Sequence, residues 1–339
     1  MSTKTPGRRC RPAPRRKGRR GLWILLILFL ILAALYTGIR CFWLRPPEQK
    51  QETSQEAQEV SGDAEGPEAD AEAEAEAEAL KSHTERKDHF YTILVSGSDD
   101  GNGNSDTNIL LAVDADGGSI YGVSIARDTK AVWGGKTHKI NAAFGAGGME
   151  KLAEVVGDQL GIPVDYTVSV DIQGFVALVD AIGGVDFDVP VDMHYEDPYQ
   201  DLYIHISKGM QHLTGAEALK VVRFREGYAT QDIGRMETQQ AFLKAVAKQV
   251  LQPGNVTKLD DFARIFQEYV ETDLTLGNLA WLGTQAISMG AENIAFSTLP
   301  GTWKDPFIYL DADEVLTLVN EHLNPYVEDR TPEDLNIPT

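Results

Sequence analysis

The run LWILLILFLILAALYTGI, residues 22–39, contains eighteen residues and no charged side chain. In a helix, eighteen residues extend about 27 Å, which is close to the thickness of the hydrocarbon core of a bilayer. Residues 1–20 precede this run with nine Lys and Arg and no acid. The pattern predicts a single-pass anchor at 22–39, a cytoplasmic N-terminal tail at 1–21 and an extracellular location for the rest of the chain.

A cleaved signal peptide is the alternative to an anchor. The apolar run is long for such a peptide, and the following YTGIRCF offers a poor cleavage site. We therefore expect an uncleaved signal anchor. Cys10 and Cys41 are the two cysteines of the chain and flank this anchor, so the exported domain is expected to fold without an internal disulfide.

The segment that follows, residues 40–88, is acidic and of low complexity. Residues 48–80 hold twelve acids and one lysine, with almost no apolar side chain to bury. This composition is typical of a linker. We expect one exported domain at 89–328, followed by a short C-terminal tail at 329–339.

Within the expected domain, apolar runs alternate between strand and helix patterns, which indicates an α/β fold. The expected strands are 90–97, 107–115, 119–125, 165–170, 185–190 and 293–301. The expected helices are 147–161, 172–184, 214–223, 234–252, about 258–272, 276–290 and 311–323. Helices are expected to dominate after residue 190, and Thr214 with Glu217 forms a capping-box pattern.

The first two expected strands flank an acidic loop, SGSDDGNGNSDT, residues 96–107. Asp99, Asp100 and Asp106 lie there among three glycines. Gly, Asn and Asp are common in solvated turns, so the loop by itself is consistent with a simple hairpin. A metal or phosphate site is the other interpretation.

Basic residues occur in three further segments. SIARDT contains Arg127 directly after a strand, and VVRFREG contains Arg223 and Arg225, which an extended segment would point to one side. GRMETQQ places Arg235 and Gln239 on one helix face.

Together these groups favour a diphosphate–metal site. Guanidinium groups bind phosphate oxygens in a bidentate way, and the carboxylates of Asp99 and Asp106 suit Mg²⁺. Taken singly, each arginine also fits a structural role. Arg127, beside Asp128, and Arg225, beside Glu226, would then form surface ion pairs.

Several other classes of function lack sequence support. The chain contains no P-loop lysine motif and no G-x-S-x-G. Residues 81–339 carry 39 acids against 19 Lys and Arg, which argues against nucleic-acid binding. The histidines show no metal-ligand spacing, which argues against a zinc site; they are His83, His89, His138, His194, His205, His212 and His322.

The order of these motifs resembles the LytR-CpsA-Psr family. The segments that carry the resemblance are VSGSDDGNGNSDTNILLAV, SIARDT, HKINAAFGAGG, GGVDFDVPVDM, GMQHLTGAEALKVVRFREG and DIGRMETQQAFLKAV. Together they cover about residues 89–328. The resemblance implies an α/β/α sandwich with a central mixed sheet, preceded by one transmembrane helix.

The resemblance also implies an activity. Members of the family are Gram-positive envelope enzymes that move a glycopolymer, such as teichoic acid or capsular polysaccharide, from a polyprenyl-diphosphate carrier. The acceptor is the C6 hydroxyl of N-acetylmuramic acid in peptidoglycan, and Mg²⁺ assists. The lipid occupies an apolar tunnel in the family. Apolar helical stripes of the kind found in this sequence mostly belong to an ordinary core, so none of their residues is assigned to lipid contact.

Family roles transfer to this sequence by position. Asp99 and Asp106 match the metal-binding acids, either of which is also the candidate base, and Arg127 matches the arginine of the RDT motif. The residues expected to bind the diphosphate are Arg127, Lys139, Arg223, Arg225, Arg235 and Gln239.

This sequence departs from the family pattern at three positions. Gly101 stands where many members have an arginine, Ala126 replaces a proline, and Thr238 replaces a second arginine in the helix motif. Two other functions therefore remain open: a diphosphatase that hydrolyses the carrier linkage, and a non-catalytic protein that binds or regulates envelope polymers.

Overall fold

The computed structural model describes the greater part of the chain from Pro46 onward, which forms one compact unit extending to Thr339. The expected anchor at 22–39 and both cysteines lie outside the described residues. No helix among the described residues is long and apolar enough to cross a membrane. The described residues are 44–49, 84–98, 105–199, 202–224, 226–228, 232–252 and 259–339.

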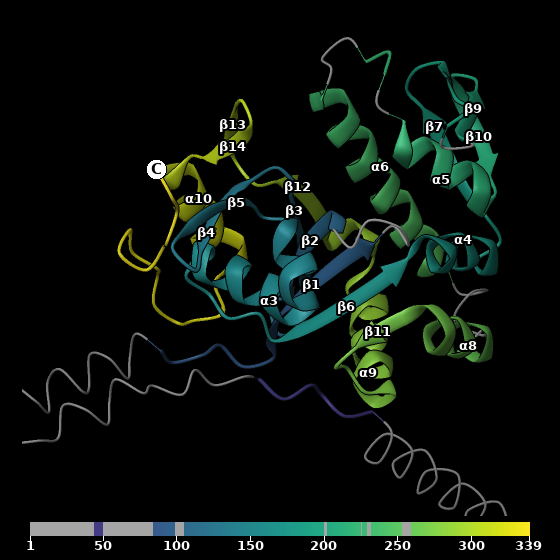
Figure 1. Cartoon of the computed structure of the whole chain (residues 1–339). Coiled ribbons are helices and arrows are strands. Elements are labelled where there is room, and N and C mark those ends of the chain that lie inside the picture. The colour runs from purple at the N-terminus through teal and green to yellow at the C-terminus, as the bar shows by residue number, and fades with distance from the viewer. Residues whose placement is uncertain are drawn as a thin grey trace, which may run out of the picture. The chain divides into compact units, whose positions relative to one another are not determined.

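A six-stranded mixed sheet lies at the centre of the fold, with strand order β11-β6-β1-β2-β3-β12 (Figure 1). β2 is antiparallel to both β1 and β3, whereas β6 is parallel to β1 and β12 is parallel to β3. β1, β3, β6 and β12 therefore end at the same edge. The strands are β1 (Phe90–Ser98), β2 (Ser105–Asp114), β3 (Ser119–Ile125), β6 (Tyr166–Asp171), β11 (Val270–Thr272) and β12 (Ile294–Thr298).

Helices cover both faces of this sheet, which confirms the predicted mixed α/β fold. On one face Phe90 and Leu94 of β1 pack in a core with α3 (Ala142–Leu160) and α10 (Ala312–Leu318). On the other face Tyr91 and Ile93 pack with residues of α9 (Leu276–Met289). Because both faces are buried, the central strands are continuous apolar runs rather than alternating ones.

A second apolar core lies beside the sheet, where two pairs of antiparallel strands pack with three helices. β7 pairs with β10, and β8 pairs with β9, both antiparallel. The helices are α4 (Ile172–Ala181), α5 (Gly215–Arg223) and α6 (Asp232–Val250). The strands are β7 (Val185–Val189), β8 (Met193–Asp197), β9 (Leu202–Ile206) and β10 (Gly209–Leu213).

The apolar stripes of α4 and α6 belong to this second core. Val179 and Phe242 are fully buried in it, and Phe175 and Val246 pack against it. These contacts support the interpretation of both stripes as ordinary core.

The strands β8, β9 and β10 correct the expectation that helices dominate after residue 190. Each strand is only five residues long, so its apolar signal is short. A second correction concerns the helix expected at about 258–272. α8 (Leu259–Tyr269) ends earlier, and the next three residues form the edge strand β11.

Two further hairpins lie outside the central sheet and were not expected from the sequence. β4 (Lys130–Trp133) pairs with β5 (Lys136–Lys139), and β13 (Gly301–Lys304) pairs with β14 (Phe307–Leu310). Short one-turn segments complete the fold, at Ala291–Asn293 (η2) and Val319–Leu323 (η3).

The predicted capping box at the start of α5 is confirmed. The Thr214 side chain accepts a hydrogen bond from the Glu217 backbone, and the Glu217 carboxylate accepts one from the Thr214 backbone N–H at 2.9 Å. Two hydrogen bonds from Thr214 lower the pKa of Glu217; the one from the backbone N–H has the larger effect, and the one from the hydroxyl the smaller.

Replacing Thr214 with alanine is expected to reduce the free energy of unfolding by about 1 kcal/mol. It should also return the Glu217 pKa part of the way toward its ordinary value, because alanine lacks the hydroxyl but keeps the backbone N–H that lowers this pKa most. A lowered folded-state pKa stabilises the fold above the unfolded pKa, and this contribution is lost as pH falls through the folded pKa. Urea unfolding at several pH values and an NMR titration of Glu217 would measure both effects. Glu217→Gln is the control, because it removes the titrating charge; an unchanged Glu217 pKa in Thr214→Ala would contradict the prediction.

Candidate active site

The candidate site lies at the edge of the sheet where β1, β3, β6 and β12 end. Ligands of open α/β sheets bind outside the carboxyl ends of parallel strands. The antiparallel register of β2 and β3 pairs Asn108 with Ile125. Asp106 lies two residues before Asn108 and Arg127 two residues after Ile125, so the chain at both positions lies at this edge.

Arg127 and Lys139 meet at this edge across one carboxylate. Lys139 Nζ lies 2.7 Å from Asp128 Oδ1, and Arg127 Nε lies 3.7 Å from Asp128 Oδ2. Both cationic side chains remain nearly 40% exposed, so the ion pairs leave them accessible to an anion from solvent. The surface ion pair between Arg127 and Asp128, which was the structural alternative to a role in binding phosphate, is therefore present. The same carboxylate also contacts Lys139.

Backbone hydrogen bonds hold the two segments of this cluster together. Ile140 N donates to Thr129 O at 2.8 Å, and Asn141 N donates to Arg127 O at 3.3 Å. The hairpin β4–β5 between them pairs Lys130 with Lys139. Its antiparallel register thus returns Lys139 to the end of β3.

Helix α6 connects this edge to the end of α5. Gln239 Nε2 donates to Val222 O at 3.0 Å, directly beside Arg223. Gln240 Nε2 donates to Thr298 Oγ1 at 2.7 Å, at the end of β12. Two neighbouring glutamines of α6 therefore hold this helix against both the end of α5, next to Arg223, and the end of β12.

The position of Arg223 differs from the expectation. Arg223 is the last residue of α5 rather than part of an extended segment, and extended backbone begins at Phe224. The last turn of α5 sets the position of Arg223. The same-side placement that an extended segment would give Arg223 and Arg225 therefore does not apply.

The other expected site residues are described less fully. Asp99 and Arg225 lie outside the described residues. Asp106 belongs to β2 and Arg235 to α6, and only their backbone positions are described. Arg235 precedes Gln239 by four positions, which is about one helical turn.

Oxygen atoms near this edge suit a hard cation. Ser105 Oγ and Thr129 Oγ1 are buried and have no hydrogen-bond partner among the described residues. A buried hydroxyl without a partner is costly, and Ser105 stands directly before Asp106. Hydroxyl and carboxylate oxygens are ligands that Mg²⁺ accepts, so the residues present fit this ion.

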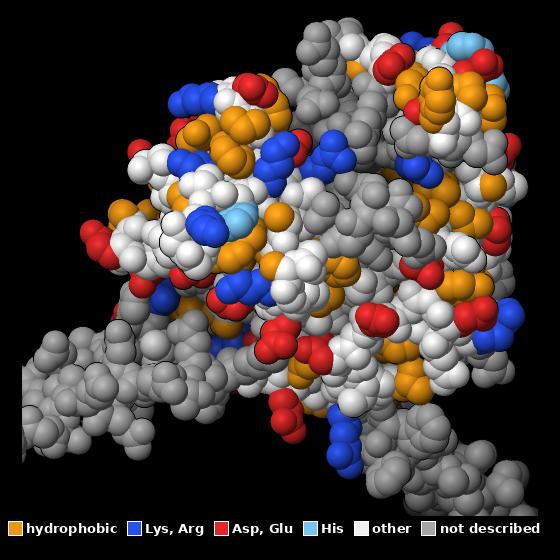
Figure 2. Space-filling model, viewed as in Figure 1, with side chains coloured by type: hydrophobic (Ala, Val, Ile, Leu, Met, Phe, Trp, Pro, Cys, Tyr) orange, Lys and Arg blue, Asp and Glu red, His pale blue; other side chains and the backbone are white. Residues whose placement is uncertain are grey.

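The space-filling view gives the electrostatic setting. Several Lys and Arg side chains lie across the upper half of the face shown in Figure 2. The whole chain has a formal net charge of −20, so this grouping of cations is a local feature. A local cationic surface favours an anionic ligand such as a phosphate.

Sequence reasoning missed the roles of Asp128 and Gln240. Asp128 was visible beside Arg127, but its contact with Lys139 depends on the unexpected hairpin β4–β5. The signal available for Gln240 was its position beside Gln239, whereas its partner Thr298 lies 58 residues away.

Comparison with known proteins is decisive for the family. Residues 53–326 match the LytR_cpsA_psr family. The chain belongs to the LytR-CpsA-Psr family. This membership confirms the resemblance that the motifs indicated.

Two relatives carry names that state an activity. Polyisoprenyl-teichoic acid–peptidoglycan teichoic acid transferase TagV of Bacillus subtilis is 32% identical over 238 residues, which is 66% of this chain and 60% of TagV. The transferase TagU of Bacillus cereus is 38% identical over 189 residues, 54% of this chain and 60% of TagU. The matched region thus spans about three fifths of each relative.

A solved structure shows the same fold. The crystal structure of Bacillus subtilis TagV superimposes with a TM-score of 0.60 at 29% sequence identity. The match covers 70% of this chain and 98% of that chain.

Proposed function

We propose that this chain is a phosphotransferase that moves a glycopolymer of the teichoic acid or capsule type from a polyprenyl-diphosphate carrier to peptidoglycan. The acceptor is the C6 hydroxyl of N-acetylmuramic acid. The observation that carries the proposal is the pair of accessible cations, Arg127 and Lys139, held by Asp128 at the ligand-binding edge of the sheet. Family membership and the names of the relatives TagV and TagU support the same reaction class.

The diphosphate is the part of the substrate that this edge is proposed to bind. Arg127 and Lys139 supply positive charge from the end of β3 and the hairpin β4–β5, and Arg223 supplies it from the end of α5. Arg225, Arg235 and Gln239 complete the proposed set.

Asp99 and Asp106 are the proposed ligands of Mg²⁺. When bound, Mg²⁺ would neutralise negative charge on the phosphoryl oxygens of the carrier. The buried Ser105 hydroxyl, which has no hydrogen-bond partner in the described part of the chain, stands beside Asp106 and supports an oxygen-rich cation site at the start of β2.

The proposed transfer is an in-line displacement at the sugar-linked phosphorus. The acceptor oxygen forms the new phosphorus–oxygen bond, and the bond from phosphorus to the bridging oxygen breaks. Polyprenyl phosphate leaves with this oxygen, and the hydroxyl proton passes to the carboxylate of Asp106 or Asp99. Arg127 and the other cations stabilise the charge that develops on the leaving phosphate.

The proposed location follows from the N-terminal sequence. We propose a single-pass membrane protein with its N-terminus in the cytoplasm, an anchor at 22–39 and the catalytic domain outside the cell. The lipid carrier would then lie in the membrane that holds the enzyme, and the acidic segment before the domain would set its distance from that membrane.

The proposed function can be tested with the purified chain in detergent, a labelled polyprenyl-diphosphate glycan, Mg²⁺ and peptidoglycan glycan strands. Label that becomes covalently attached to the strands, and that is lost with a chelator, is the expected result. Release of labelled glycan without attachment would instead identify a diphosphatase. Binding of the lipid with neither reaction would identify a non-catalytic protein and would direct attention to Gly101 in the acidic loop.

A further inference from the structure

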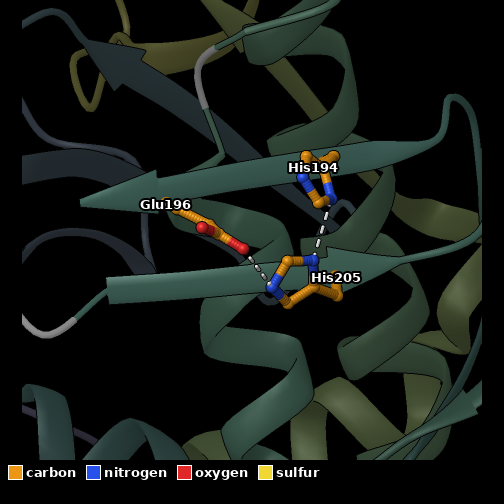
Figure 3. Close-up of side chains that lie close together, drawn as sticks. All are labelled: His194, Glu196 and His205. Carbon is orange, nitrogen blue, oxygen red and sulfur yellow. Dashed lines mark hydrogen bonds and ion pairs between the residues drawn. The ribbon is translucent and has the colours of Figure 1, made fainter. Parts of the chain in front are cut away.

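The hairpin β8–β9 presents two histidines and a glutamate on its outer face. The antiparallel register pairs His194 directly with His205. Glu196 is two residues beyond His194, so its side chain projects from the same face of the strand. All three side chains are exposed, and Figure 3 shows them pointing toward one another across the two strands.

These side chains contact each other through the atoms that bind metals. His205 Nδ1 lies 2.8 Å from His194 Nδ1, and His205 Nε2 lies 3.2 Å from Glu196 Oε1. One potential ligand atom from each residue lies within 4.8 Å of the other two. Ligand atoms around a tetrahedral zinc ion are about 3.3 Å apart, because each bond is about 2.0–2.1 Å. His205 uses opposite ring nitrogens in its two contacts, so binding one ion requires these exposed side chains to rotate from the positions shown.

We propose that His194, Glu196 and His205 form a binding site for a divalent transition-metal ion, with Zn²⁺ as the representative ion. Two imidazoles and one carboxylate match the preferences of Zn²⁺ and of neighbouring ions such as Co²⁺ and Ni²⁺. Mg²⁺ prefers oxygen ligands and is not expected to compete at this site. The site is therefore distinct in chemistry from the proposed Mg²⁺ site at Asp99 and Asp106.

The inner face of the hairpin holds the three ligands in place. Met193, Ile204 and Ile206 point inward and are buried in the second core, with exposed fractions of 1%, 0% and 7%. Strand alternation then fixes the outward direction of His194 and His205. Ligands on packed strands are positioned more precisely than ligands on loops. An ion bound to both histidines would cross-link β8 to β9.

The sequence argued against a zinc site because the histidines lack ligand spacing along the chain. The pairing of β8 with β9 brings together two of them that are eleven residues apart, and neither strand was expected. Histidine side chains are visible at the upper right of Figure 2, where Figure 1 places β9 and β10.

A neighbouring histidine provides a matched control. Where β7 pairs with β10, His212 Nδ1 lies 2.8 Å from Asp186 Oδ1, and both residues are exposed. This pair offers two ligands rather than three. His212→Ala therefore removes an exposed histidine from a strand pair of similar length without removing a proposed ligand.

The test is a Zn²⁺ titration of the full chain in detergent, produced without a histidine tag and freed of metal with a chelator. Calorimetry is expected to show one saturable Zn²⁺ site per chain. An excess of Mg²⁺ on the order of 5 mM should not displace the bound Zn²⁺, because Mg²⁺ prefers oxygen ligands. Co²⁺ at the same site is expected to give the visible absorption of a tetrahedral ion, and Zn²⁺ should raise the melting temperature.

His194→Ala and His205→Ala are each expected to weaken Zn²⁺ binding by at least about tenfold, because loss of even an indirect metal contact costs that much. Glu196→Gln, which keeps the size of the side chain, should weaken binding in the same direction, whereas His212→Ala should bind like the parent chain. The melting temperature without metal should match the parent for all four variants. Unchanged binding in both histidine variants, equal weakening in His212→Ala, or no saturable binding would overturn the proposal.

Discussion

Replacing Arg127 with alanine is expected to lower the rate of polymer transfer by about 10³-fold or more while leaving the protein folded. A positioned arginine that stabilises a transferring phosphoryl group contributes on the order of 10³–10⁵ to the rate. Arg127 follows β3 at the edge where ligands are expected, and its partner Asp128 also holds Lys139. Its side chain is 39% exposed and lies outside the apolar core, so its loss leaves no cavity.

The transfer assay with labelled carrier lipid and glycan strands measures this effect. Lys136→Ala is the matched control, because Lys136 is an exposed cation on the same hairpin β4–β5 as Lys139. It should transfer polymer at the parent rate. Arg127→Lys keeps the charge but loses bidentate contact, so it should retain only part of the activity. Parent-like transfer in Arg127→Ala would remove this residue from the proposed mechanism.

Replacing Asp165 with asparagine is expected to destabilise the fold by about 3–5 kcal/mol, which is the usual cost of breaking a buried ion pair. Arg86 makes two parallel contacts with the carboxylate, at 2.7 and 2.8 Å. The exposed fractions of the two side chains are 8% and 0%. Asp165 also accepts a hydrogen bond from Thr92 N in β1 at 2.9 Å. The pair therefore joins the chain before β1 to the start of β6.

Urea unfolding of the parent chain and of Asp165→Asn measures this loss, as the difference in the free energy of unfolding when both curves have the same m-value. The exposed pair of His89 and Asp116 provides a control, since Asp116→Asn should change stability by no more than about 0.5 kcal/mol. Adding Arg86→Met to Asp165→Asn should restore part of the stability, because no unpaired buried charge remains. If Asp165→Asn were as mild as Asp116→Asn, the buried pair would not hold the two segments together.

The sequence predicted the central strands and most helices because their signals are local. β3 was expected at 119–125 and occupies Ser119–Ile125, since its β-branched and aromatic residues directly follow a glycine turn at Gly117 and Gly118. The helix expected at 147–161 also forms, and Gly161 ends it in a left-handed conformation with φ of 63°. Short hairpins such as β8–β9 escaped prediction because only one face of each strand is apolar.

The candidate site was predictable in its residue types but not in its contacts. Arginines and acids near glycines suggested a diphosphate and a cation, and both remain predictions. The shared partner of Arg127 and Lys139 was not expected, because the contact depends on the register of β4 with β5. The role of Gln239 at the diphosphate stays a prediction, and the hydrogen bond that its amide nitrogen donates to Val222 O was not expected from the sequence.

The sequence by itself determined the features that neighbouring residues create, such as the start of α5 at the capping residue Thr214. A capping box forms within four residues, so its hydrogen bonds need no distant partner. Only the tertiary structure decided which distant residues meet: Lys139 with Asp128, Gln240 with Thr298, and His194 with His205. The physical reason is that strand register and helix packing minimise the exposed apolar surface of the whole domain. The strand register and helix packing that bury the apolar side chains also determine which polar side chains come into contact.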